Sequence, residues 1–115
     1  MPGIDANGNF DDRGNNSFYC AGQDTGEPCP EIDVMEANQH AWQTTLHQCD
    51  ENPDVKGHYD TCDGWGFDKK IWEMDKTAYG PGDQFTINTQ KEFHTKFEYH
   101  TDKNGKLSQV VTTLT

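Results

Sequence analysis

The chain has 115 residues, enough for one domain or part of one, and 31% of them are apolar. Aromatic residues make up 11%, more than a disordered acidic tail contains, so composition indicates a folded, turn-rich β-protein. The net charge of −11 opposes binding to nucleic acid and to anionic membranes, and no apolar run is long enough to span a bilayer. The expected partner is neutral or cationic, and a neutral polysaccharide qualifies.

The N-terminal region reads as loop. Residues 3–17 are dense in Gly, Asn and Asp, which favour turns. Asn15-Asn16-Ser17 is an N-glycosylation sequon, relevant only to a secreted protein. Met1-Pro2-Gly3 leads into a polar turn rather than an apolar stretch, so no signal peptide is present here. A secreted protein would therefore have its true N-terminus upstream, and this chain would be an internal fragment.

Several later segments alternate polar and apolar residues, as half-buried strands do. They are residues 31–36, 84–89 and 92–101, followed by 107–114 after an Asp102–Gly105 turn. The Asn-Gly pair in that turn predicts a β-hairpin. No stretch carries a helical apolar stripe. We therefore predict an all-β fold, an antiparallel β-sandwich, in which residues 1–115 form a single partial domain.

The cysteines indicate the redox compartment. An even count at loop-like positions predicts two disulfides in an oxidising environment. Zinc is the alternative, but no cysteine pair has the C-x₂-C spacing of a zinc knuckle. No metal or other cofactor is expected. The four residues are Cys20, Cys29, Cys49 and Cys62.

The segment Glu31-Ile-Asp-Val-Met-Glu36 carries three carboxyl groups. Glu31 and Asp33 are two apart on a strand, so their side chains share a face. Glu36 would fall on the opposite face of an ideal strand, and one bulge residue after Asp33 would bring it round. Two carboxyl groups about 5–5.5 Å apart suit a glycosidase that retains the configuration of the sugar.

The three acids would have different tasks, because three packed carboxyl groups cannot all ionise at low cost. Asp33, between the two glutamates, would hydrogen-bond to Glu31 and orient it. Glu36 would act as general acid and then as general base. Taken alone, the hexapeptide also fits a solvated polar strand face, because clustered acids mark catalytic sites only in a fraction of cases.

The wider sequence resembles family-7 glycoside hydrolases, the cellobiohydrolases and endoglucanases. Residues 29–38 resemble their active-site strand, which reads C-x-E-M-D-I-W-E-A-N. Further stretches match in the same order, and together with residues 29–38 they cover nearly the whole chain. They are residues 4–8 and 18–20 (M-D-A-D-G and G-Y-C), 45–49 (T-P-H-P-C), 57–63 (Y-A-G-T-C-D) and 79–87 (Y-G-P-G…F-T-V).

This resemblance implies a retaining enzyme that cleaves β-1,4-glucosidic bonds in cellulose or related β-glucans. Glu31 would be the nucleophile, Glu36 the acid/base, and Asp33 the residue that tunes Glu31. His47 and Asn38 would contact substrate, His47 on the leaving-group side.

The resemblance also implies the disulfide pairing and the setting of the protein. The pairs would be Cys20–Cys29 and Cys49–Cys62. The protein would be extracellular, and a monomer when full length.

Departures from the family favour an open cleft and endo-like action. Met35 stands where the family has tryptophan, and Ala21 where it has an acid. The arginines of the product-side subsites have no clear match, and the loops between paired cysteines are short. Trp42, Trp65 and Trp72 are candidate sugar-stacking platforms, although core packing is the alternative for each.

Two other functions stay open at this stage. A family-16-like β-1,3(4)-glucanase shares the E-x-D-x-x-E strand and the jelly roll. A non-catalytic carbohydrate-binding relative would have kept the strand and lost turnover, although clustered, mutually repelling acids give a pure binder no advantage.

Overall fold

The computed structural model describes residues 7–9, 20–22, 27–50 and 58–115. The chain divides into two compact units, which are described separately below. The first comprises Met1–Asp33 and Thr45–Asp68, and the second comprises Val34–Thr44 and Lys69–Thr115. The Asn15 sequon and most of the predicted N-terminal loop lie outside the described residues, and the prediction of a single domain stays a prediction.

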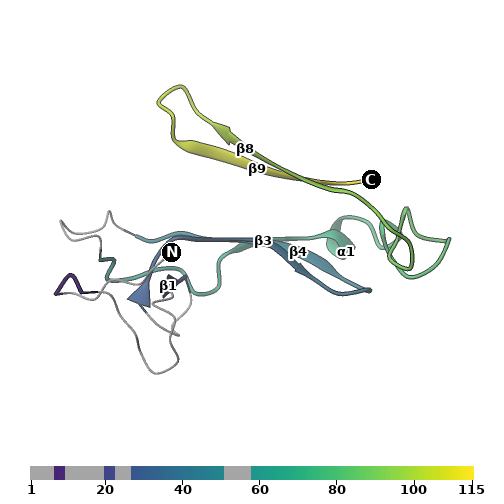
Figure 1. Ribbon diagram of the computed structural model, residues 1–115, viewed down its shortest axis with the longest axis horizontal. Helices are drawn as coiled ribbons and strands as arrows, with labels where there is room; N and C mark the ends of the chain where they lie inside the picture. The colour runs from purple at the N-terminus through teal and green to yellow at the C-terminus, as the bar shows by residue number, and fades with distance from the viewer. Residues whose placement is uncertain (1–6, 10–19, 23–26, 51–57) are drawn as a thin grey trace. The chain divides into compact units, whose positions relative to one another are not determined.

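The described chain is all-β, as predicted, with one single-turn helix (Figure 1). Four separate sheets have the strand orders β1-β2, β3-β4-β5, β6-β7 and β8-β9. In the described part, no helix combines the length and the apolar character needed to cross a membrane. The elements are β1 (Cys20–Ala21), β2 (Glu27–Pro28), β3 (Glu31–Ala37), β4 (Trp42–His47), β5 (Phe67–Lys70), α1 (Ile71–Met74), β6 (Tyr79–Gly80), β7 (Ile87–Asn88), β8 (Thr95–Thr101) and β9 (Leu107–Leu114).

The strand predicted at residues 31–36 is β3, and a tight turn joins it to β4. The side-chain oxygen of Asn38 accepts the backbone N–H groups of His40 and Ala41, at 2.8 and 3.1 Å. The Asn38 N–H in turn donates to the Ala41 carbonyl at 3.0 Å. This short connection makes β3 and β4 a hairpin. Sequence reasoning missed β4 because polar Thr45 and His47 occupy buried positions on it.

The hairpin predicted at the C-terminal end is β8 and β9, which pair antiparallel from Thr95↔Leu114 to Thr101↔Leu107. Gly105 adopts φ +79° in the turn, a conformation that glycine reaches without steric cost. Strand β8 begins at Thr95 rather than at residue 92.

The strand predicted at residues 84–89 is wrong in extent, because only β7 (Ile87–Asn88) is strand. The preceding residues turn back: the Phe85 N–H donates to the Gly82 carbonyl at 3.2 Å, and the Asn88 side chain accepts the Gly82 N–H at 2.9 Å. The two-residue pairs β6-β7 and β1-β2 are parallel.

An aromatic cluster forms the core of the second unit. The Trp42 side chain packs edge-on against Tyr79 and Phe93, with ring centroids 6.0 and 6.3 Å apart, and stacks on Phe97 at 6.4 Å. Trp42 is only 2% exposed, so it is a core residue and not a sugar-stacking platform. Its indole N–H has no hydrogen-bond partner among the described residues.

Candidate active site

Strand β3 places Glu31 and Asp33 together in the first unit. Both side chains are half-buried while Ile32 between them is exposed, as expected for strand residues two apart. One oxygen of each carboxylate and one ring nitrogen of His47 all lie within 4.8 Å of one another. The structure thus brings three of the predicted site residues into one cluster.

His47 is buried at the end of β4 and hydrogen-bonded through both ring nitrogens. Nδ1 lies 2.7 Å from the Asp63 carbonyl oxygen, and Nε2 lies 3.0 Å from Oδ2 of Asp33. A carbonyl can only accept, so Nδ1 carries a hydrogen. Nε2 and a carboxylate oxygen can then bond only if a second proton lies between them. The Asp33–His47 pair therefore holds one proton.

The electrostatics place that proton mainly on His47. Burial acts to lower the pKa of His47, but the hydrogen bond to the Asp63 carbonyl and the charge and hydrogen bond of Asp33 outweigh it. The Glu31 carboxylate adds to the same effect, and the net result is a raised pKa. An imidazolium paired with an ionised Asp33 is the favoured state.

Two glycines make room for the His47 side chain. A Cβ at Gly22 would overlap the His47 Cβ and lie 2.6 Å from its Cγ, and a Cβ at Gly66 would lie 2.9 Å from Cε1 and Nδ1. The partner carbonyl is held by the Cys49–Cys62 disulfide and the Asp63 N–H, which donates to the Gln48 carbonyl at 2.8 Å. The ring orientation is therefore fixed by packing as well as by hydrogen bonds.

Glu31 has its own backbone partner. The Gly22 N–H donates to Glu31 Oε2 at 2.9 Å, and the Cys20–Cys29 disulfide lies beside both residues. The two disulfides, Cys20–Cys29 and Cys49–Cys62, confirm the pairing expected from the resemblance.

Glu36 and Asn38 belong to the second unit and are described with it. Glu36 is exposed, and its Oε2 accepts a hydrogen bond from Gln43 Nε2 at 3.1 Å. The Asn38 side-chain oxygen is engaged in the β3-β4 turn. The bulge that would bring Glu36 to the face of Asp33, and the substrate contact of Asn38, both stay predictions.

The Glu31–Asp33–His47 cluster has the donor types of a divalent metal site. Both ring nitrogens of His47 are already used, however, by Asp63 and Asp33. A metal would have to displace the Asp33–His47 hydrogen bond and its proton. We therefore propose no role for a metal ion at this cluster.

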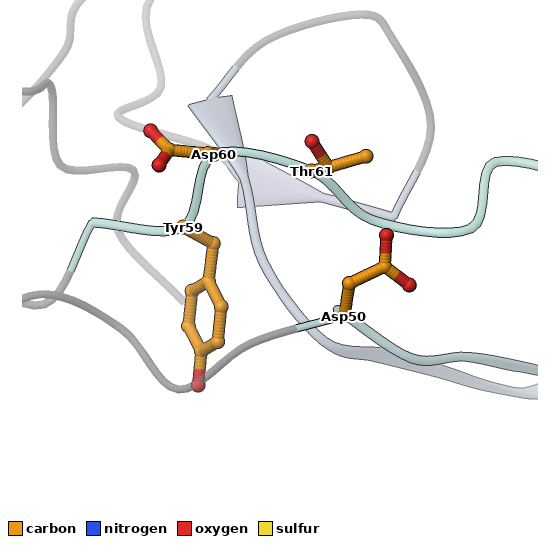
Figure 2. A pocket seen from close by; sticks show the side chains of 4 residues that line it. All are labelled: Asp50, Tyr59, Asp60 and Thr61. Atoms are coloured by element: carbon orange, nitrogen blue, oxygen red, sulfur yellow. The ribbon is translucent and has the colours of Figure 1, made fainter.

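A separate pocket lies beside the Cys49–Cys62 disulfide (Figure 2). Its described lining residues are Asp50, Tyr59, Asp60 and Thr61. The Asp50 N–H donates to the Thr61 carbonyl at 3.3 Å across it. None of the clustered residues Glu31, Asp33 and His47 is among these lining residues, so the pocket is distinct from the candidate active site.

Sequence reasoning missed four residues that shape the site. Gly22, Asp63 and Gly66 act through backbone groups or through the absence of a side chain, which no residue-type pattern reveals. Asp63 lies within residues 57–63, which match the family, but no role was predicted for it. The fourth residue, Gln43, is on the unpredicted strand β4.

An all-β fold with carboxyl groups clustered on one strand is compatible with the β-sandwich glycoside hydrolases as a class. The sequence model of glycosyl hydrolase family 7 matches residues 3–114, and the chain belongs to that family. This membership decides against the family-16 alternative.

Individual relatives agree with the family and show how much of it is present. Endoglucanase 1 of Humicola insolens is 29% identical over 96 residues, which are 74% of this chain and 23% of the relative. The native structure of Humicola insolens endocellulase EGI matches with a TM-score of 0.66 and 26% identity, over 77% of this chain and 24% of that one. A family-7 cellobiohydrolase from Daphnia pulex matches with a TM-score of 0.64 and 28% identity, over the same shares. The chain thus spans about a quarter of the length of these relatives.

Proposed function

We propose that this chain carries the catalytic strand of a retaining cellulase that cleaves β-1,4-glucosidic bonds, with Glu31 as nucleophile and Glu36 as acid/base. The observation that carries the proposal is the Glu31–Asp33–His47 cluster on β3 and β4 of a family-7 chain. The names of its relatives, an endoglucanase and a cellobiohydrolase, favour cellulose as substrate.

The proposed reaction is a double displacement. The Glu31 carboxylate attacks the anomeric carbon, and the glycosidic bond breaks as Glu36 gives its proton to the leaving oxygen. Glu36, now a base, takes a proton from water, which attacks the same carbon and releases Glu31. Two inversions restore the original configuration.

Asp33 and His47 support the nucleophile in this proposal. An imidazolium at His47 offsets part of the negative charge that Glu31 and Asp33 place close together. It also fixes Asp33, whose carboxylate can then orient Glu31. Contact of His47 with the sugar remains a further proposal, and its 4% exposure makes an effect through Asp33 the more direct role.

An open cleft with endo-like action is the proposed mode, because the loops between paired cysteines are short and the product-side arginines lack clear matches. We further propose that the protein acts outside the cell, where its two disulfides persist. It would act as a monomer when full length, on a polysaccharide and without a cofactor.

The decisive experiment is mechanism-based labelling. The disulfide-intact chain is incubated with an activated 2-fluoro cellobioside, and peptides are analysed by mass spectrometry, with Glu31→Gln as the matched control. A sugar adduct on the peptide containing Glu31, absent from the control, supports the nucleophile and the retaining mechanism. A folded chain that binds cello-oligosaccharides without forming an adduct would favour the non-catalytic relative instead.

A further inference from the structure

The backbone N–H of Gly22 donates to Glu31 Oε2 at 2.9 Å in a partly buried setting. We infer that Gly22 is a positioning residue for Glu31, and that the Cys20–Cys29 disulfide holds its N–H at the carboxylate. The inference rests on the proposed function for its catalytic consequence, but the contact itself can be tested without turnover.

A small, covalently closed scaffold presents this N–H. Strands β1 and β2 pair in parallel, with Cys20 opposite Glu27 and Ala21 opposite Pro28. The Cys29 N–H extends the pairing by donating to the Ala21 carbonyl at 3.1 Å. Cys20 lies two positions before Gly22, and Cys29 lies two positions before Glu31. The disulfide between them therefore links the chain at the same short distance from the hydrogen-bond donor and from its acceptor.

The scaffold is buried, which limits its motion. Cys20 is 4% exposed, and Ala21 and Cys29 are each 5% exposed. A backbone donor held in such surroundings needs little reorganisation when charge moves on its acceptor. Donation to Oε2 fixes the plane of the Glu31 carboxylate, and with it the direction of the second oxygen.

Only glycine fits at position 22. A Cβ there would overlap the His47 Cβ and lie 2.6 Å from Cγ and 3.1 Å from Nδ1. Any larger residue must displace either its own backbone, and the N–H with it, or the His47 ring that bonds Asp33. One residue thus links the position of Glu31 to that of the Asp33–His47 pair.

The contact is tested first by NMR on the oxidised chain labelled with ¹⁵N-glycine. The Gly22 amide resonance should move as Glu31 is protonated, and this movement should be absent in Glu31→Gln. The Gly105 amide, which donates to the Asp102 carbonyl in a separate turn, should behave alike in the parent and in Glu31→Gln and is the internal control. A Gly22 amide that behaves alike in the parent and in Glu31→Gln would overturn the inference, whether or not the chain is active.

The role of the disulfide is tested with the variant Cys20→Ala/Cys29→Ala. In the parent background, the rate of labelling by the 2-fluoro cellobioside at saturation should fall about 10- to 100-fold, the scale for a misplaced catalytic group. The half-saturating concentration should hardly change, because the carboxylate is misdirected while sugar binding is kept.

The same cysteine changes are then made in a Glu31→Ala chain supplied with α-cellobiosyl fluoride and a sugar acceptor. There the acceptor hydroxyl attacks the anomeric carbon and gives its proton to Glu36 as fluoride leaves, so no nucleophilic carboxylate is needed. The loss caused by the cysteine changes should be at least about tenfold smaller in this background. Equal losses in both backgrounds would mean that the disulfide serves the fold in general, and would overturn its positioning role.

Discussion

Oδ2 of Asp33 lies 3.0 Å from Nε2 of His47, and the other ring nitrogen donates to a backbone carbonyl, so the two side chains hold one proton between them. The pKa of His47 is raised, although burial acts to lower it. A group whose pKa is higher folded than unfolded stabilises the fold fully below its unfolded pKa, about 6.5 for histidine, and loses this contribution as pH rises through the folded value.

We therefore expect the free energy of unfolding to fall as pH rises from about 6.5 through the folded pKa of His47. Asp33→Asn removes the charge that favours the imidazolium, so the fall should end at lower pH and be smaller. Urea denaturation at a series of pH values measures both. A stability that is flat across this range in the parent would contradict the shared proton.

Asp33→Asn should also slow the enzyme. The amide keeps the shape of the side chain but lacks the charge that stabilises the His47 imidazolium beside the nucleophile, so kcat should fall about 10- to 100-fold. KM should change little, because Asp33 acts on the nucleophile. Initial rates on a soluble cello-oligosaccharide separate the two constants, and a change confined to KM would place Asp33 in substrate binding instead.

Gly66 and Gly105 form a matched pair for the packing around His47. Both have positive φ, +68° and +79°, so alanine at either position costs about 1–2 kcal/mol in backbone conformation. At Gly66 alone, the new Cβ would lie 2.6 Å from Thr45 Cγ2 and 2.9 Å from the His47 ring.

Gly66→Ala should therefore destabilise the fold by about 1–3 kcal/mol more than Gly105→Ala, the usual range for overpacking. It should also alter the pH dependence attributed to His47. Thermal denaturation of the two variants makes the comparison, and equal losses would show that the His47 site can relax around an added methyl group.

Trp42 provides a test of the aromatic core. Trp42→Ala removes the ring that contacts Tyr79, Phe93 and Phe97, and should lower the free energy of unfolding by about 3–5 kcal/mol. Trp42→Phe should be milder than this, since no hydrogen bond of the indole N–H is lost among the described residues. If the phenylalanine variant were as unstable as the alanine variant, the indole N–H would have a partner beyond those residues.

Sequence reasoning found what residue order encodes directly. The alternation of polar and apolar residues located β3, β8 and β9, and the Asn-Gly pair located the turn between β8 and β9. The two-residue spacing of Glu31 and Asp33 placed their side chains on one face of the strand. The alternation pattern predicted too long a strand around β7, because Gly82 and Asn88 form a local hydrogen bond where the pattern suggested a strand.

The contacts that organise the site were beyond such reasoning. The Gly22 N–H and the Asp63 carbonyl are backbone groups, and every residue other than proline carries such a donor, as every residue carries such an acceptor. Their placement depends on which cysteines pair and on long-range packing of His47 between chain segments. Only the family resemblance carried information of that kind, since it implied both disulfide pairings.

Trp65 is the remaining candidate for sugar stacking in the first unit. Its ring is 94% exposed, and its backbone N–H is held by the Asp63 side chain at 3.0 Å. The same Asp63 accepts the hydrogen bond of His47 through its carbonyl. One turn thus fixes the histidine of the cluster and presents an indole face that a pyranose ring can cover.

Trp65→Ala should weaken binding of cellotetraose about three- to tenfold, as expected from about 0.5–1.5 kcal/mol for one aromatic contact. It should leave the free energy of unfolding unchanged within about 0.5 kcal/mol, as for surface changes in general. Titration calorimetry measures the first and urea denaturation the second, with Trp72→Ala, at a residue only 38% exposed, as comparison. Unchanged affinity, or a marked loss of stability, would contradict a sugar-stacking role for Trp65.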